Sequence, residues 1–133
     1  MTGILIISHF TLAESLKQTA ELIIGKRENV STLSLSKNEK VETFAERLKS
    51  EVDKLNKGSG VIIFSDMFGG TTSNVALSLF ADDDNIKIMT GFNLPIVIEA
   101  IMHSSKTANE LLKMLMDKKD KTIVDAKAIF KKR

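Results

Sequence analysis

The stretch from Val61 to Asn74 constrains the fold of this chain more than any other. It begins as an unbroken apolar run of strand length, passes through Asp66 and the pair Gly69-Gly70, and then carries apolar residues at helical spacing. This order predicts a strand, a glycine turn and a helix N-terminus. Free amides at a helix N-terminus, together with the helix dipole, attract anions, and glycines let the backbone close around them. We therefore expect a phosphate or carboxylate site at this turn.

The size and composition of the chain limit what can surround this turn. Its 133 residues fit a single domain spanning 1–133, and 43% apolar with 27% charged residues is typical of a soluble globular protein. A net charge of +2 with dispersed lysines indicates no nucleic-acid partner. The absence of cysteine excludes disulfides, thiol catalysis and thiolate metal sites. We expect no metal and no bound cofactor.

The beginning of the chain predicts a strand buried on both faces. Residues Gly3 to Ile7 form a short apolar run rich in β-branched side chains, and the run ends at Ser8 and His9. The run is too short for a signal sequence or a membrane span, and no basic leader precedes it. We therefore expect a cytoplasmic protein.

Strand-like and helix-like segments alternate along the rest of the chain. Further strands are expected at 30–35 and 86–90, on either side of the central run in sequence. Helix starts are indicated by a proline in a first turn and by three capping boxes: Pro95, and Thr11 with Glu14, Ser36 with Glu39, and Thr107 with Glu110. Such alternation forms right-handed βαβ units. The predicted fold is α/β, a doubly wound, mainly parallel sheet of order 2-1-3-4 with helices on both faces.

The last segment follows a different pattern. From Val124 to Phe130 the chain alternates with a period of two, over a length too short to indicate a helix. We predict a C-terminal edge strand here.

The predicted strand order brings two distant segments together. In a sheet of order 2-1-3-4, ligands bind outside the carboxyl ends of strands one and three, where the chain reverses its direction of travel. Strand one delivers His9 to that edge, and strand three delivers Asp66 and the turn from Gly69 to Thr72. A histidine, a carboxylate and an anion cradle are therefore expected to share one crevice.

This combination of groups suits phosphoryl transfer. A neutral imidazole is nucleophilic at one nitrogen, and a carboxylate on the other N–H fixes the tautomer and stabilises the imidazolium that develops. Asp66 is the candidate partner of His9, and phosphoryl oxygens need preplaced donors, for which the candidates are Gly69, Gly70, Thr71 and Thr72. Neither a P-loop lysine nor a G-x-G-x-x-G motif is present, so the expected phosphoryl donor is a protein.

Apolar side chains are expected on the same rim. Phe10, Met67, Phe68 and Phe92 each follow the end of a strand and are candidates for a docking surface. The alternative is that they fix helix starts to the core. Structural roles also stay open for His9 and for Asp66 as a helix cap, and His103 is interpreted as a C-terminal capping residue.

Taken together, these residues resemble the IIA (EIIA) domains of the mannose family of the bacterial phosphoenolpyruvate-dependent sugar phosphotransferase system. The resemblance covers nearly the whole chain and is carried by three segments: Ile4 to His9 with Leu12-Ala13-Glu14, Asp66 to Thr71 with Asn74, and Gly91 to Pro95. It implies a histidine phosphocarrier in sugar uptake. His9 would accept a phosphoryl group from the phosphocarrier protein HPr and pass it to a histidine of an EIIB domain. Asp66 would orient His9, and Thr71 with nearby amides would bind the phosphoryl group.

The resemblance also implies an assembly. Family members form homodimers in which the C-terminal strand crosses to the other subunit, which would account for the alternating stretch from Val124 to Phe130. Association with the membrane components EIIC and EIID would be indirect. Whether EIIB lies on a separate chain is left open, although the end of the sequence soon after that stretch argues against a fusion. The transported sugar is set largely by the membrane components and is not predicted.

Small departures from the family pattern occur at the turn. Thr71 replaces a serine often found there and keeps the hydroxyl, and Thr72 stands where a proline can occur. The phosphotransfer subunit of dihydroxyacetone kinase shares the fold and the histidine, but its turn resembles Gly-Ser rather than Gly-Gly, and it is the nearest rival interpretation. Two more functions stay open: a regulatory phosphohistidine module without onward transfer, and a small-anion binding domain without covalent chemistry.

Overall fold

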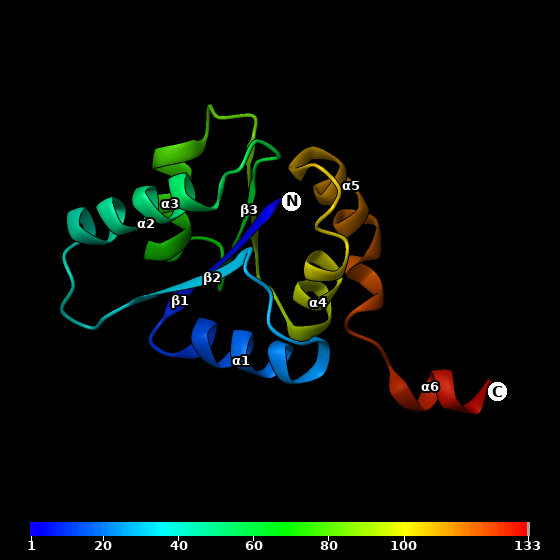
Figure 1. Cartoon of the computed structure of the whole chain (residues 1–133). Helices are drawn as coiled ribbons and strands as arrows, with labels where there is room; N and C mark the ends of the chain where they lie inside the picture. Colours follow the sequence, from blue (N-terminus) through cyan, green and yellow to red (C-terminus); the bar gives the residue numbers. More distant parts are fainter. Residues whose placement is uncertain (133) are drawn as a thin grey trace.

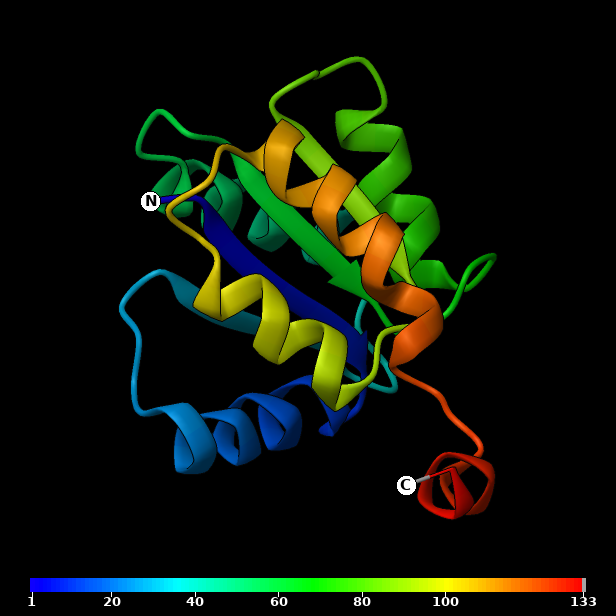
Figure 2. The same ribbon diagram turned by 90° about the vertical axis from the view of Figure 1, so that its right-hand side faces the viewer.

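The computed structural model describes residues 1–132 and contains one parallel sheet (Figures 1 and 2). Its strands are β1 (Gly3–His9), β2 (Val30–Leu35), β3 (Val61–Ser65) and β4 (Ile86–Thr90). They lie in the order β2-β1-β3-β4, and every neighbouring pair is parallel. The predicted order 2-1-3-4 is confirmed.

Helices cover both faces of this sheet, as predicted. The α-helices are α1 (Leu12–Ile24), α2 (Val41–Leu55), α3 (Thr71–Phe80), α4 (Leu94–Met102), α5 (Ala108–Lys118) and α6 (Ala126–Lys131), and a 3-10 turn, η1 (Lys119–Lys121), follows α5. Helices α2 and α3 pack on one face, and α1, α4 and α5 pack on the other (Figure 1). Within residues 1–132, no helix combines the length and apolar character needed to cross a membrane.

The two central strands, β1 and β3, are covered on both faces, which explains why their sequences are continuously apolar. Ile4 and Ile6 of β1 face α1, α4 and α5, whereas Leu5 and Ile7 face α2 and α3. Strand β3 divides its side chains in the same way, and all of these apolar side chains are buried. Each buried Ile or Leu contributes about 1.5–3 kcal/mol relative to exposure. Both strands are therefore held at the centre of the sheet, with their carboxyl ends fixed side by side.

Only one of the three predicted capping boxes forms. Thr107 and Glu110 make both reciprocal hydrogen bonds at the start of α5. At α1 the Thr11 side chain caps nothing, and the Ser8 hydroxyl accepts the Ala13 N–H at 2.8 Å instead. Ser8 reaches this amide because Phe10, with φ of 53°, bends the chain back between strand and helix. The start of α1 is thereby tied to the end of β1.

The second capping-box prediction is wrong because the helix begins later than expected. Glu39 accepts the Ser36 N–H at 3.3 Å, but α2 starts at Val41 with Lys40 as its N-cap. Glu39 also pairs with Arg47 at 2.7 Å. The Ser36–Glu39 pair thus closes a turn before the helix. The prediction for Pro95 is confirmed, since it lies in the first turn of α4.

The predicted C-terminal strand is also wrong. Residues Ala126–Lys131 form helix α6, capped by the Asp125 side chain, which accepts the Ala128 N–H at 3.1 Å. This segment leaves the body of the molecule, as Figures 1 and 2 show, so local hydrogen bonds replace a strand ladder. Alanine and lysine favour a helix under those conditions. Strand exchange with a second copy stays a prediction.

Candidate functional site

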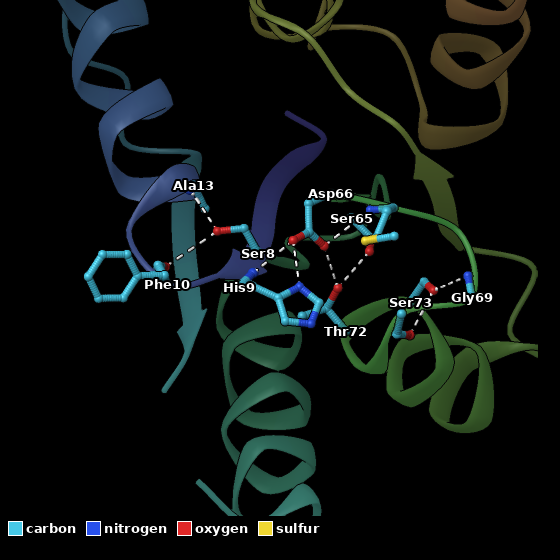
Figure 3. A network of polar contacts seen from close by, with 11 residues as sticks. Ser8, His9, Phe10, Ala13, Ser65, Asp66, Gly69, Thr72 and Ser73 are labelled. Atoms are coloured by element: carbon cyan, nitrogen blue, oxygen red, sulfur yellow. Dashed lines mark hydrogen bonds and ion pairs between the residues drawn. The ribbon is translucent and has the colours of Figure 1, made fainter. Parts of the chain in front are cut away.

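His9 and Asp66 meet at the carboxyl ends of the two central strands. His9 is the last residue of β1, and Asp66 follows β3 directly; the pairing of Ile7 with Ser65 brings both to one edge. The His9 Nδ1 lies 2.7 Å from the Asp66 Oδ2, and the His9 backbone N–H donates to the same oxygen at 2.8 Å (Figure 3). The structure confirms the predicted meeting of these side chains.

The Asp66 carboxylate accepts hydrogen bonds on both oxygens. Besides the two donors of His9 on Oδ2, its Oδ1 accepts the Met67 N–H at 3.1 Å and the Thr72 hydroxyl at 2.7 Å. Partial burial alone would raise the pKa of Asp66, but hydrogen bonds from the His9 backbone and ring and from Thr72 hold that pKa below its ordinary value. The carboxylate is therefore ionised at neutral pH and can only accept.

An ionised Asp66 determines the tautomer of His9. Because the carboxylate has no proton to donate, the ring nitrogen that faces it must carry one. The neutral imidazole is then protonated on Nδ1 and has a free lone pair on Nε2. The His9 side chain is 46% exposed. In Figure 3 the far side of the ring points away from Asp66. A reactive nitrogen is thus available to an incoming molecule.

The glycine turn passes very close to the His9 ring. A Cβ on Gly70 would lie 3.2 Å from the His9 Cε1 and 3.1 Å from the Met67 Cγ, so this position favours glycine. Gly69 has φ of 86°, a left-handed conformation that other residues rarely adopt. The turn therefore brings the N-terminus of α3 against the ring, as the sequence predicts.

Hydrogen bonds within the turn already use the amides of both glycines, which the sequence suggested as donors to an anion. Gly69 donates its N–H to the Ser73 hydroxyl at 3.1 Å, and Gly70 donates to the Met67 carbonyl at 3.4 Å. Asn74 donates its side-chain N–H to the Gly69 carbonyl at 3.3 Å and so braces the turn. In contrast, Thr71 begins α3, where the first N–H groups have no intrahelical acceptor. Thr71 is partly exposed, whereas Thr72 and Ser73 are fully buried, so Thr71 rather than the glycines is the candidate hydrogen-bond donor to an anion at this helix start.

Thr71 and His9 line a common surface groove. The groove has a volume of about 390 Å³, and its wall includes Phe10 and Lys37. An anion held there would meet the α3 N-terminus, a lysine and the His9 ring. The Thr72 side chain does not reach the groove, because it is fully buried and bound to Asp66. The contact of Thr72 with a phosphoryl group stays a prediction, and the burial of the whole residue does not favour it.

Three of the four predicted interface residues are exposed beside the site. Phe10, Met67 and Phe68 are exposed, and Leu12 at the start of α1 extends this apolar rim. Phe92 is only partly exposed and packs against the core under α4 and α5. For Phe92 the structure therefore favours the alternative role of fixing a helix start.

Other polar side chains support the site without having been predicted. Ser65 and Ser8 are buried next to Asp66 and His9, and Ser73 bridges the turn from Gly69 to Gly70. The only sequence signal for them was their place at strand ends and in a helix first turn. His103, the other histidine, lies at the C-cap of α4, with its Nε2 3.4 Å from a Glu99 carboxylate oxygen. Among residues 1–132, no cluster of three or more His, Asp or Glu side chains could hold a metal ion.

Comparison with curated proteins finds similar sequences among components of sugar phosphotransferase systems. Over 100 residues the chain is 32% identical to the PTS system mannose-specific EIIAB component of Escherichia coli strain K12. It is 29% identical over 101 residues to the PTS system fructose-specific EIIA component of Bacillus subtilis strain 168. These matches cover 75% and 76% of this chain, but 31% and 69% of the two relatives. The chain thus spans about a third of the E. coli protein.

Solved structures and a family model agree with these relatives. The PTS IIA protein associated with the fucose utilization operon of Streptococcus pneumoniae superposes with a TM-score of 0.88 at 32% identity, covering 97% of this chain and 96% of that one. The family model EIIA-man, PTS system fructose IIA component, matches residues 3–116, from β1 to α5. Since that match includes both strands that position His9 and Asp66, the chain belongs to the EIIA-man family of phosphotransferase system IIA components.

Proposed function

We propose that this chain acts as a single IIA domain that carries a phosphoryl group on the Nε2 of His9. It accepts the group from phospho-HPr and passes it to a histidine of an EIIB domain in sugar uptake. One observation carries the proposal: the 2.7 Å contact between the His9 Nδ1 and an ionised Asp66, which leaves Nε2 as the nucleophilic nitrogen. Membership of a family of sugar phosphotransferase components supports it.

The transfer step exchanges one bond to phosphorus for another. The lone pair of Nε2 attacks phosphorus, the bond from phosphorus to the donor breaks, and its electron pair returns to the donor. The His9 ring gains positive charge as the Nε2–P bond forms. Asp66 stabilises that charge from the other side of the ring, while the Nδ1 proton stays between the two groups. Transfer to EIIB reverses these movements.

The phosphoryl oxygens need donors in place before the reaction. Thr71, the first residue of α3, lines the groove that contains His9, and the positive end of the helix dipole favours an anion there. Lys37 lines the same groove and brings a positive charge, while the carboxylate of Glu39, which also lines it, is paired with Arg47 at 2.7 Å. The N-terminus of α3 is therefore the proposed cradle for the phosphoryl group, with Gly70 allowing the ring to approach it.

The exposed rim beside His9 is the proposed docking surface. Phe10 lines the groove, and Met67 and Phe68 are exposed in the loop that follows Asp66; aromatic residues and Met are enriched at protein interfaces. HPr and EIIB both have to reach the same nitrogen, so they would use this surface in turn. Such exchange requires weak, transient complexes, which suits a small rim. The relay would operate in the cytoplasm, and contact with EIIC and EIID would pass through EIIB.

A homodimer is part of the proposal. The C-terminal segment exposes the apolar side chains Ile123, Val124, Ile129 and Phe130, and β4 is an edge strand with unpaired backbone groups. Both are features that a second copy could cover. Sedimentation equilibrium of the full chain tests this assembly: a dimer supports it, and a monomer that does not associate on concentration contradicts it.

Phosphorylation by the purified upstream proteins tests the function directly. The chain is incubated with phosphoenolpyruvate, enzyme I and HPr, and intact mass should show one acid-labile phosphoryl group. The chain has two histidines, so His103→Ala is a matched control that should label normally, whereas His9→Ala should not label. Labelling of His9→Ala at full stoichiometry would overturn the assignment. Labelling of the wild type without transfer to any EIIB would support a regulatory module instead.

A further inference from the structure

The contact between His9 and Asp66 continues into the protein interior. The Thr72 Oγ1 lies 2.7 Å from the Asp66 Oδ1 and 2.8 Å from the Ser65 Oγ (Figure 3). Thr72 and Ser65 are both 0% exposed, so water does not compete for these hydrogen bonds. Four side chains from β1, β3, the loop after β3 and α3 thus form one chain of hydrogen bonds that ends at the reactive histidine.

The directions of these hydrogen bonds follow from the number of protons. A hydroxyl has one proton, and the Asp66 carboxylate can only accept, so Thr72 must give its proton to Asp66. Thr72 then has only lone pairs left for Ser65, which makes Ser65 the donor in the second bond. Every donor in the chain points toward the carboxylate. While Asp66 is ionised, no other placement of the hydroxyl protons gives the same number of hydrogen bonds.

The Thr72 contact also restrains the carboxylate in space. Thr72 lies in the first turn of α3, and Ser65 ends β3, so their bond joins the two ends of the loop that contains Asp66. Without the Thr72 hydroxyl, Oδ1 would retain only the Met67 N–H at 3.1 Å, from the adjacent residue. Asp66 could then rotate away from His9. The ring would lose the acceptor that keeps its proton on Nδ1.

We propose that Thr72, oriented by Ser65, is a positioning residue that holds Asp66 against His9 and so maintains a single His9 tautomer with a free Nε2. This inference rests on the proposed phosphocarrier function and gives Thr72 a role different from the phosphoryl contact predicted from the sequence. Thr72 touches neither the phosphoryl group through its hydroxyl nor the partner proteins. It acts on the reaction only through Asp66.

Substitutions that separate the Thr72 hydroxyl from its shape test the proposal. Thr72→Val keeps the volume and removes the hydroxyl, and it should slow phosphorylation of His9 by about 10- to 100-fold, the effect of a small misplacement of reacting groups. Thr72→Ser keeps the hydroxyl and should restore most of the rate. Thr19→Val, on the exposed side of α1, makes the same chemical change away from the site and should leave the rate unchanged. Equal rates for Thr72→Ser and Thr72→Val would overturn the proposal.

A double-mutant cycle distinguishes action through Asp66 from a general structural effect. In an Asp66→Ala background, Thr72→Val should cause no further loss of rate, because the group that it positions is already absent. If the two losses multiply instead, Thr72 acts independently of Asp66 and the proposal fails. Thermal unfolding of each variant shows that the fold is retained. Should Thr72→Val not fold, Ser65→Ala replaces it, with a smaller loss of rate expected in the same direction.

Spectroscopy of the unphosphorylated protein separates this inference from the proposed function. In Thr72→Val, the pKa of Asp66 measured from its carboxyl ¹³C shift should rise toward the ordinary value, because one lowering hydrogen bond is lost. The ¹⁵N shifts of the His9 ring should change from a single Nδ1–H tautomer to a mixture. Unchanged spectra would overturn the role of Thr72 even if the rate falls. If the wild type never accepts a phosphoryl group, the proposed function fails, while these spectra still decide the role of Thr72.

Discussion

Replacement of Asp66 by asparagine removes the charge of the carboxylate while keeping its shape. Asp66 accepts two hydrogen bonds on each oxygen, so an amide places an NH₂ group against donors in either orientation. With the NH₂ toward His9, the ring must move its proton to Nε2, which removes the nucleophilic lone pair. With the NH₂ toward Thr72, the hydroxyl can turn to accept it, and the amide oxygen stays on His9. The second orientation is expected because only the Met67 contact is lost.

The expected cost then comes mainly from the missing charge. Hydrogen bonds to a charged group contribute about 1.5–3 kcal/mol, against roughly 0.5–1.5 kcal/mol for neutral pairs. Across the two contacts with His9, this difference corresponds to about 2 kcal/mol of stability. In the transition state Asp66 also faces a developing imidazolium. Because the His9 side chain is 46% exposed, solvent reduces that attraction, and we expect a loss of about 1.4–2.8 kcal/mol, or about 10- to 100-fold in rate.

Rapid-quench measurement of transfer from phospho-HPr at saturating donor isolates this loss from any change in docking. Asp84→Asn makes the same chemical change at an exposed side chain just before β4, at the opposite edge of the parallel sheet from His9, and its rate should equal that of the wild type. Urea unfolding measures the stability difference separately. A transfer rate for Asp66→Asn equal to the wild-type rate would refute the role of the charge, whatever the effect on stability.

Three further predictions follow from the same geometry. Gly70→Ala should slow phosphorylation with little loss of stability, because the added Cβ would lie 3.2 Å from the His9 Cε1; ring ¹⁵N shifts identical to wild type would contradict this. Phe10→Gly should unfold at a higher urea concentration than Phe10→Ala, because glycine relieves about 1–2 kcal/mol of strain at φ of 53°, while both slow HPr docking. The pKa of Asp66 lies below its ordinary value of 3.8. The ionised carboxylate therefore stabilises the folded state above pH 3.8, and this stabilisation is lost as the pH falls through the pKa of the folded protein. The difference in unfolding free energy between wild type and Asp66→Ala should shrink in acid.

The parts of the fold that were predictable from sequence are those set by burial. The apolar runs from Ile4 to Ile7 and from Val61 to Phe64 fit only strands covered on both faces, and the structure buries every one of these residues. The alternation of strands with helices then limits the sheet to a few strand orders. The meeting of His9 and Asp66 follows from that order, because parallel strands present their carboxyl ends at one edge.

The features that were not predictable depend on which partner a polar side chain finds in three dimensions. A threonine in a helix first turn can face a ligand, cap the helix or bind a nearby carboxylate, and its sequence position does not distinguish these roles. Thr72 binds Asp66 because the turn through Gly69 and Gly70 folds the start of α3 back onto the end of β3. Thr11 fails to cap α1 for a similar reason, since Ser8 reaches the free amide first.

The C-terminal segment shows the limit of short patterns. Alternation from Val124 to Phe130 is compatible with a strand only if an open sheet edge is available to it. In the single chain the segment extends away from the sheet, and the Asp125 cap with alanine and lysine favours the helix α6.

The position of the phosphoryl group on the ring tests the central claim most directly. After phosphorylation by phosphoenolpyruvate, enzyme I and HPr, ¹H–¹⁵N and ³¹P NMR of the labelled chain identifies the modified nitrogen. The contact between Nδ1 and Asp66 predicts a phosphoryl group on the Nε2 of His9, with Nδ1 still protonated. A phosphoryl group on Nδ1, on His103 or on no histidine would contradict the mechanism.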